Sequence, residues 1–151
     1  MIVAGSLLAG CEKWKDIIHK EKEKDKVYVA KNLPMSGLQE SPQRSTPATG
    51  LIDAKYNKKT KTLDFTVKWA ELTNVPTGSH IHGPAAKGTN AGIKYDFFDI
   101  FPKSRSGYFT NSVVVDGIAI KEDSLIKGYY YVNIHTATYP GGEIRGQIEF
   151  K

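Results

Sequence analysis

Apolar and polar residues alternate strictly over residues 63–69. The apolar members of this alternation are Leu63, Phe65, Val67 and Trp69. Successive side chains of an extended chain point to opposite faces, so a period of two predicts a β-strand with one buried and one solvated face. The segment is therefore expected to form one wall of a β-sheet over a hydrophobic core.

Shorter runs rich in Val, Ile, Tyr, Phe and Thr recur along the rest of the chain, separated by Gly, Pro, Asn and Asp. Residues 33–47 are rich in Pro, Ser, Gly and Gln and are expected to be a loop, and residues 121–128 predict one short helical turn. The predicted strands are 27–30, 48–56, 63–69, 79–82, 91–98, 108–115, 129–137 and 143–150, of which the last two form a hairpin.

This pattern predicts an all-β protein with an antiparallel Greek-key β-sandwich or barrel of about seven or eight strands. A chain of 151 residues is long enough for a single domain with a substantial core. The net charge is +5, but the basic residues are scattered and form no stripe with stacking aromatics. We therefore expect no nucleic-acid partner.

The N-terminal segment differs from the rest of the chain. Residues 2–10 are apolar and small, and residues 12–26 alternate in charge, with few apolar side chains to bury. Between them lies Cys11, the single cysteine, which excludes both an internal disulfide and a thiolate zinc site. Residues 11–26 are expected to form a charged tether, as a solvated helix or an extended segment.

Leu8-Ala9-Gly10-Cys11 resembles the lipobox of bacterial lipoprotein signal peptides. The resemblance implies that residues 1–10 are a removed signal peptide, that Cys11 is lipidated, and that the protein is anchored to a bacterial membrane in an extracytoplasmic space. Glu12 after the cysteine favours the outer membrane. The alternative is an ordinary apolar N-terminus in which the cysteine has no such role.

Histidines supply the candidate chemistry. His80 and His82 are spaced i, i+2 on a predicted strand, so their rings lie on one face, and His135 lies on a second predicted strand. Three neutral imidazoles suit one copper or zinc ion, with Asn133 on the His135 side of its strand as a supporting partner. The alternative is a structural role, in which each ring hydrogen-bonds to loop carbonyls.

Polar residues also alternate along the last predicted strand, at Glu143, Arg145 and Gln147. They either support an anion near His135 or form hydrogen bonds that fix the C-terminal hairpin, with Glu40 or Asn133 as partners. No Ser-His-Asp arrangement, phosphate-binding glycine loop or pair of catalytic carboxylates is recognisable, so we assign no catalytic residue.

Several segments together resemble the CHRD domain, which occurs in chordin and in many bacterial extracytoplasmic proteins. The segments are HIHGPAA, GTNAG and GYYYVNIHTATYPGGEIRGQI, with LQESP, ATG and TLDFTVKWAEL upstream. The resemblance covers residues 27–151 and implies an exported module that binds an unknown protein or small ligand without catalysis. The stretch 94–106 (KYDFFDIFPKSRS) is bulkier than the resemblance leads us to expect.

A weaker resemblance links the histidines to Cu/Zn superoxide dismutase, a Greek-key barrel. His80 and His82 resemble its paired ligands, and His135 resembles a later copper ligand. No histidine lies between His82 and His135, so the bridging ligand of a two-metal site is absent. This resemblance implies, as the alternative function, a site for one copper or zinc ion with superoxide chemistry.

Overall fold

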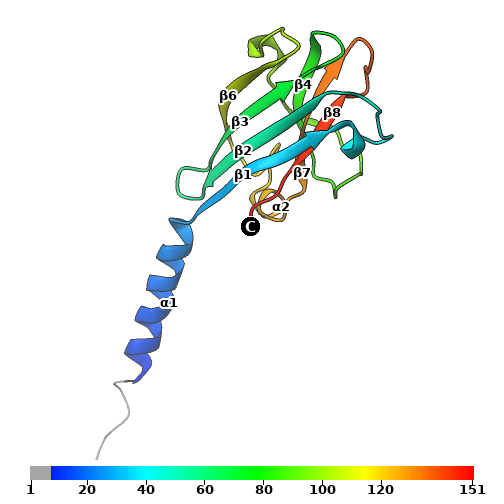
Figure 1. Cartoon of the computed structure of the whole chain (residues 1–151). Coiled ribbons are helices and arrows are strands. Elements are labelled where there is room, and N and C mark those ends of the chain that lie inside the picture. Colours follow the sequence, from blue (N-terminus) through cyan, green and yellow to red (C-terminus); the bar gives the residue numbers. More distant parts are fainter. Residues whose placement is uncertain (1–7) are drawn as a thin grey trace, which may run out of the picture.

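The computed structural model describes residues 8–151, without the side chains of residues 8–11, 13 and 20. Most of the predicted signal peptide at 1–10 and the side chain of Cys11 therefore lie outside the described residues. A β-domain carries a helix that projects from it (Figure 1). The elements are α1 (Leu8–Lys24), β1 (Val27–Ser36), the 3₁₀ helix η1 (Gly37–Gln39), β2 (Thr49–Asn57), β3 (Thr62–Ala70), β4 (Pro76–His82), β5 (Ile93–Asp96), the 3₁₀ helix η2 (Phe98–Ile100), β6 (Gly107–Val114), α2 (Glu122–Ile126), β7 (Tyr130–Thr136) and β8 (Ile144–Ile148).

The strands form one eight-stranded antiparallel sheet in the order β5-β4-β7-β8-β1-β2-β3-β6. Its two edge strands approach each other through side chains. The amide of Asn111 donates to Tyr95 Oη at 3.0 Å, and the rings of Phe97 and Phe109 stack 5.5 Å apart. The sheet is thus a nearly closed barrel, which confirms the predicted all-β antiparallel class and its short helical turn, α2.

The core lies inside this barrel. The alternation along β3 is confirmed, since its four apolar side chains are all at most 3% exposed. The bulky stretch 94–106 has a clear role there, because it inserts Phe97 and Phe101 into the core. Phe101 stacks on Trp69 at 4.3 Å, and Phe97 meets Phe65 edge to face at 5.4 Å. These aromatics close the seam between the two edges of the sheet.

The first strand is longer than predicted, since β1 runs to Ser36 through a segment expected to be a loop. Leu33 and Met35 are buried, and the strand resumes its pairing with β2 after an irregularity between Ala30 and Leu33. Pro34 is tolerated because β1 pairs with β8 only at Ser36, so no ladder hydrogen bond is lost. Proline was thus a misleading loop signal here.

A second, polar layer covers the outer face of β4, β7 and β8. Two segments, 37–48 and 83–92, lie over this face, and we call them the cover loops. They are tied to each other where Asn90 Nδ2 donates to Ser41 O at 2.8 Å, and to β8 where Gln147 Nε2 donates to Ala85 O at 3.1 Å. Side chains on this face are therefore buried although they point away from the core.

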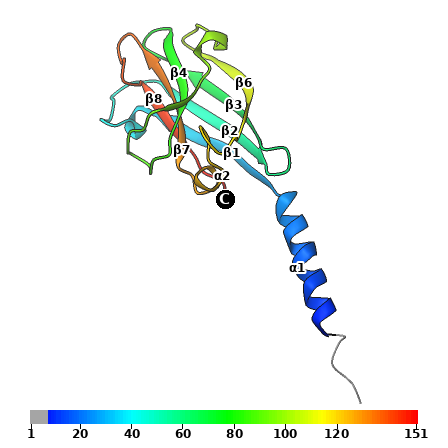
Figure 2. The ribbon, with the colours of Figure 1, turned by 180° about the vertical axis from the view of Figure 1, so that it is seen from behind.

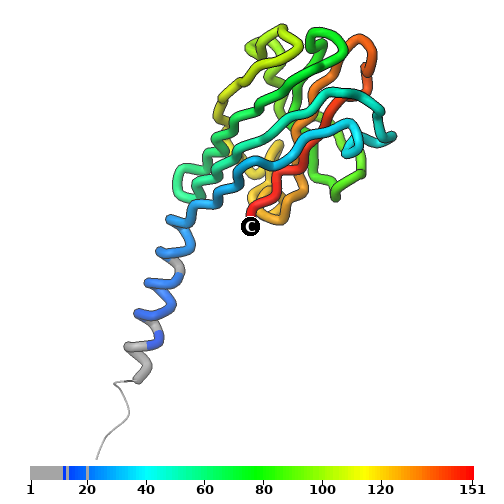
Figure 3. The backbone as a smooth tube through the Cα atoms, viewed as in Figure 1, coloured from blue at the N-terminus to red at the C-terminus, as the bar shows by residue number. Residues whose placement is uncertain are grey.

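Helix α1 stands off the barrel in both ribbon views (Figures 1 and 2). Trp14, Ile17 and Ile18 are exposed on it, and its last turn meets the β2–β3 turn, where Lys58 Nζ lies 3.6 Å from Glu23. The C-terminus returns close to the junction of α1 and β1 (Figure 3), and Phe150 contacts Tyr28 there at 5.9 Å between ring centres. Within residues 8–151, no helix is both long and apolar enough to cross a bilayer.

Candidate metal centre

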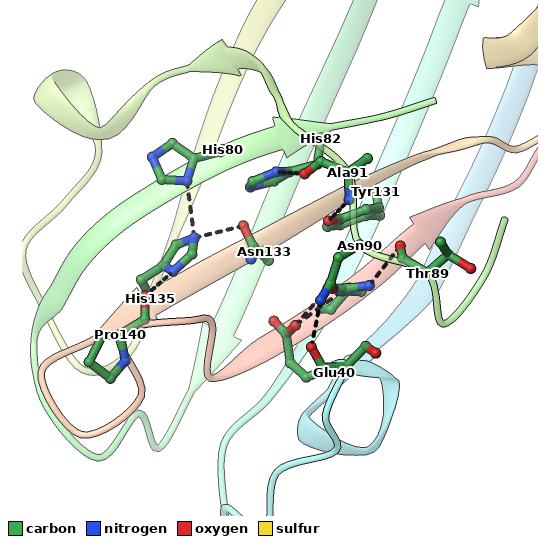
Figure 4. Close-up of polar contacts among 12 residues, drawn as sticks. Glu40, His80, His82, Thr89, Asn90, Ala91, Tyr131, Asn133, His135 and Pro140 are labelled. Atoms are coloured by element: carbon green, nitrogen blue, oxygen red, sulfur yellow. Dashed lines mark hydrogen bonds and ion pairs between the residues drawn. The ribbon is translucent and has the colours of Figure 1, made fainter. Parts of the chain in front are cut away.

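The three predicted histidines meet on the outer face of the sheet. β4 and β7 are antiparallel neighbours whose register places His80 opposite Asn133 and Gly78 opposite His135. Ligand atoms of the three imidazoles lie within 4.8 Å of one another, and the rings converge from the two strands (Figure 4). His82 is buried, whereas His80 and His135 are partly exposed. The prediction of metal binding itself stays a prediction.

Backbone carbonyls determine the tautomers of two of the rings. His82 Nδ1 donates to Ala91 O and His135 Nδ1 donates to Pro140 O, each at 2.8 Å. A carbonyl oxygen only accepts, so each Nδ1 carries the proton and each neutral ring keeps a lone pair on Nε2. His82 Nε2 is buried and has no hydrogen-bond partner. Both rings are therefore held in the form that ligates a metal.

The third ring has a carboxylate on its far side. His80 Nε2 lies 3.7 Å from Asp96 Oδ2, and His80 Nδ1 lies 3.0 Å from His135 Nε2. His80 therefore presents Nε2 to Asp96 and Nδ1 to the other two imidazoles. Asp96 is on the edge strand β5, and the sequence offered no signal that it would reach His80.

Burial keeps the imidazoles neutral. It is the largest cause that lowers the pKa of His80 to about 4, and the neighbouring His135 adds to the effect. Burial likewise lowers the pKa of His82 and the pKa of His135, against the opposing hydrogen bonds to Ala91 and Pro140. Metal ligation requires the neutral imidazole, so all three rings are in a competent state near pH 7.

Tyr131 supports the cluster from behind. Its ring stacks on His82 at 5.0 Å with an interplanar angle of 4°, and the guanidinium of Arg145 lies over the same ring at 3.9 Å. The Tyr131 hydroxyl also accepts from the backbone N–H of Ala91, whose carbonyl orients His82. Tyr131 is one of three consecutive tyrosines, and the sequence does not show which of them will face the histidines.

Arg145 joins the two cover loops to the sheet. It pairs with the buried Glu40 at 3.0 Å and also donates to Thr89 O at 3.3 Å and to Asn90. Burial raises the pKa of Glu40, and the lowering influence of Arg145 does not fully offset it. Glu40 is one of the two partners that the sequence suggested for the polar residues of the last strand.

Glu143 does not belong to the imidazole cluster. Its carboxylate accepts hydrogen bonds from Thr46 Oγ1, from the N–H and hydroxyl of Thr73, and from Thr136 Oγ1, at 2.6 to 2.9 Å. These donors come from three separate segments of the chain. Glu143 therefore fixes the end of the barrel, and Asn133 and Arg145 are the polar residues of β7 and β8 that adjoin the histidines.

Replacing Arg145 tests whether its ion pair with Glu40 stabilises the packing of the cover loops on the sheet. We expect Arg145→Met to lower the free energy of unfolding by about 3–5 kcal/mol, because Glu40 is left buried without a partner. Adding Glu40→Gln should recover part of the loss. Lys68→Met, which breaks the exposed pair with Asp53 at 3.2 Å, should cost at most about 1 kcal/mol. Urea unfolding measures all of these, and equal losses for the two single variants would contradict the argument.

The lowered histidine pKa values also predict how stability varies with pH. Between about pH 4 and 6.5, the histidines of the unfolded chain bind protons that the buried imidazoles of the folded, metal-free protein do not bind. Because the unfolded state binds more protons, the free energy of unfolding should rise with pH over this range. The raised pKa of Glu40 contributes a smaller, opposite slope. Urea unfolding in a chelator should show the rise, reduced in His80→Gln and unchanged in His19→Gln, which alters an exposed residue. A profile that falls over this range would contradict it.

Comparison with known proteins gives one match. The family model of the CHRD domain matches residues 32–148, well over half of the chain. No curated protein and no solved structure gave a match. The likeness to Cu/Zn superoxide dismutase and the lipoprotein assignment therefore stay predictions. The matched range contains the three histidines of the cluster, both cover loops and the whole sheet except the first residues of β1. Because this match covers more than half of the chain, the chain belongs to the CHRD domain family.

Proposed function

We propose that this domain binds one copper or zinc ion through His80, His82 and His135. The observation that carries the proposal is His82 Nε2, which is buried without a hydrogen-bond partner and belongs to the cluster of imidazole nitrogens. A buried acceptor without a partner costs about 1–3 kcal/mol. A bound cation would remove this cost, and imidazole nitrogen is a preferred donor for both metals.

The structural alternative accounts for only part of the arrangement. The Nδ1 atoms of His82 and His135 do tie loop carbonyls, as that alternative requires. The alternative also accounts for the 3.0 Å contact between His80 Nδ1 and His135 Nε2, which is a hydrogen bond when His80 Nδ1 carries the proton. It does not explain why the buried His82 Nε2 faces no donor. Metal binding would use the ring nitrogens on the inner side of the cluster, of which His82 Nε2 has no other partner.

The proposed role is a non-catalytic binding module, with the metal ion as its ligand. Superoxide chemistry is the alternative, and it requires copper in the site. A copper-loaded protein that consumes superoxide faster than the same amount of free copper would support the enzyme over the module. No such acceleration would leave binding as the function.

Metal analysis of the purified domain is the direct test. We expect one copper or zinc ion per chain by elemental analysis after reconstitution and desalting, and a loss of at least about 100-fold in affinity in His82→Ala and in His135→Ala, since each removes one of three ligands. His19→Ala is the matched control, because His19 lies on α1 and is exposed. Uptake well below one ion per chain, or equal loss in the control, would refute the proposal.

We further propose that the domain is held at a bacterial membrane, facing an extracytoplasmic space, by a lipid on Cys11. The charged helix α1 supports this proposal, because it projects from the barrel and ends at the barrel's first strand. At 1.5 Å per residue, the 14 helical residues from Cys11 to Lys24 would separate the lipid from the barrel by about 20 Å. Membrane attachment by lipid needs more than one acyl chain to be stable.

Cys11→Ser tests the anchor. In a bacterial host, we expect the wild-type protein to incorporate labelled palmitate and to sediment with membranes, and the variant to do neither, because serine offers no thiol for the lipid. Lys22→Ala, farther along α1, should behave as the wild type. If Cys11→Ser incorporates no palmitate but still sediments with membranes, a feature other than the lipid holds the protein at the membrane.

A further inference from the structure

We infer that α1 lies along a phospholipid surface with negative headgroups and inserts the side chains of Trp14, Ile17 and Ile18 into it. The helix is then a membrane contact of its own, next to the proposed lipid on Cys11. The inference goes beyond the proposed anchor, in which α1 only separates the lipid from the barrel. It rests on how apolar, basic and acidic residues are distributed around the helix axis.

The apolar residues of α1 gather on one side of the helix. Between residues 12 and 24 they are only Trp14, Ile17 and Ile18, and their spacing of i, i+3 and i+4 places them on one face. They are 67%, 41% and 50% exposed, so the barrel does not bury them. Glu21 follows on the same face, which limits the apolar stretch to the half of the helix nearer Cys11. Covering these three side chains would remove a substantial apolar area from water.

Lysines flank this face on both sides. At about 100° of rotation per residue, Lys15 and Lys22 lie about 80–100° from Trp14 on one side. Lys24 lies about 80° from Trp14 on the other side. Lysine side chains in such positions cover apolar surface with their methylene groups and extend the ammonium group to the level of the lipid phosphates. This arrangement is typical of helices that lie in the plane of a membrane interface.

The acidic residues of α1 lie mainly on the opposite side. Three of them are exposed and lie about 160–180° around the axis from Trp14, namely Glu12, Asp16 and Glu23. Glu23 Oε2 lies 3.6 Å from Lys58 Nζ on the β2–β3 turn, so the acidic side is the one that meets the barrel. The apolar face is therefore directed away from this contact, and a membrane can reach it while the barrel stays in water.

Position 11 shares the apolar face. It precedes Trp14 by three residues and Ile18 by seven, which places it on the same side of α1. This step rests on the proposed lipidation, since a lipid at that position would bring the apolar face to the bilayer. An acyl chain and an amphipathic helix are separate membrane signals, and stable anchoring draws on more than one signal.

Charge favours a lipid surface over a second copy of the chain as the partner of this face. If two copies paired through it, their flanking lysines would lie beside one another and repel. Negative headgroups attract the same lysines. The charge pattern therefore identifies the partner as membrane lipid.

Vesicle binding of the unlipidated chain tests the inference. The chain begins at residue 11 with Cys11→Ser, and it keeps every buried residue of the core, since these lie within residues 30–148. With vesicles of phosphatidylcholine and phosphatidylglycerol, we expect it to sediment with the vesicles and its tryptophan emission to shift to shorter wavelength. Trp14 is the source of this shift, because Trp69 is buried in the core, and Trp14→Phe should remove it.

Two glutamate substitutions at adjacent positions separate insertion from charge. Ile18→Glu should weaken binding to these vesicles at least about tenfold, because a carboxylate replaces an inserted apolar side chain. His19→Glu is the matched control, since it introduces the same carboxylate about 140° around the helix from Trp14. It should leave binding within about twofold of the parent chain.

The outcomes separate this contact from the lipid anchor. A parent chain that does not bind the vesicles, an emission that does not shift, or equal binding by Ile18→Glu and His19→Glu overturns the inference. A dimer that Ile18→Glu dissociates, with no vesicle binding, also overturns it and assigns the apolar face to a second copy. Palmitate labelling tests the lipid on Cys11 independently, so failure of either result leaves the other standing.

Discussion

The pairing of β4 with β7 determines where every group of the imidazole cluster lies. Its register sets His80 across from Asn133 and Gly78 across from His135, so rings that are 55 residues apart in the chain come within 3.0 Å. Side chains alternate along a strand, and a slip of one residue would turn the histidines of one strand into the core. The apolar residues between them, such as Ile81 and Ile134, are fully buried and oppose that slip.

The outer face of these strands is buried without being apolar. Cover loops lie over it, and the ion pair between Arg145 and Glu40, both nearly inaccessible to solvent, joins them to β8. Burial of unpaired charge is far more costly than burial of a pair, so the loops, the arginine and the carboxylate form one unit. This unit also places Ala91 and Asn133, which orient the histidines. The support of the site is therefore inseparable from the packing of the loops.

The hydrogen bonds of the ring nitrogens, more than the number of histidines, are the basis on which we propose a cation at this centre. Carbonyls of Ala91 and Pro140 take the protons of two rings, and burial opposes the uptake of further protons. His82 Nε2 is left without a hydrogen-bond partner at the cluster, which is why we propose a metal ion there. A structural histidine cluster would instead be expected to pair each inner nitrogen with a donor, which His82 Nε2 lacks.

Much of the fold could be predicted from residue pattern alone, because strand formation depends on local alternation and turn residues. The alternation over 63–69, the C-terminal hairpin and the shared face of His80 and His82 all follow from the two-residue period of an extended chain. Proline at position 34 misled the prediction, since its cost depends on whether a neighbouring strand needs its N–H. The reach of Asp96 to His80 and the stacking of Tyr131 on His82 had no sequence signal. Asp96 and His80 are cross-strand partners in the pairing of β5 with β4, and Tyr131 and His82 are partners in the pairing of β7 with β4. Which strands pair, and in which register, depends on contacts far apart in the chain, so these neighbours became visible in the folded chain alone.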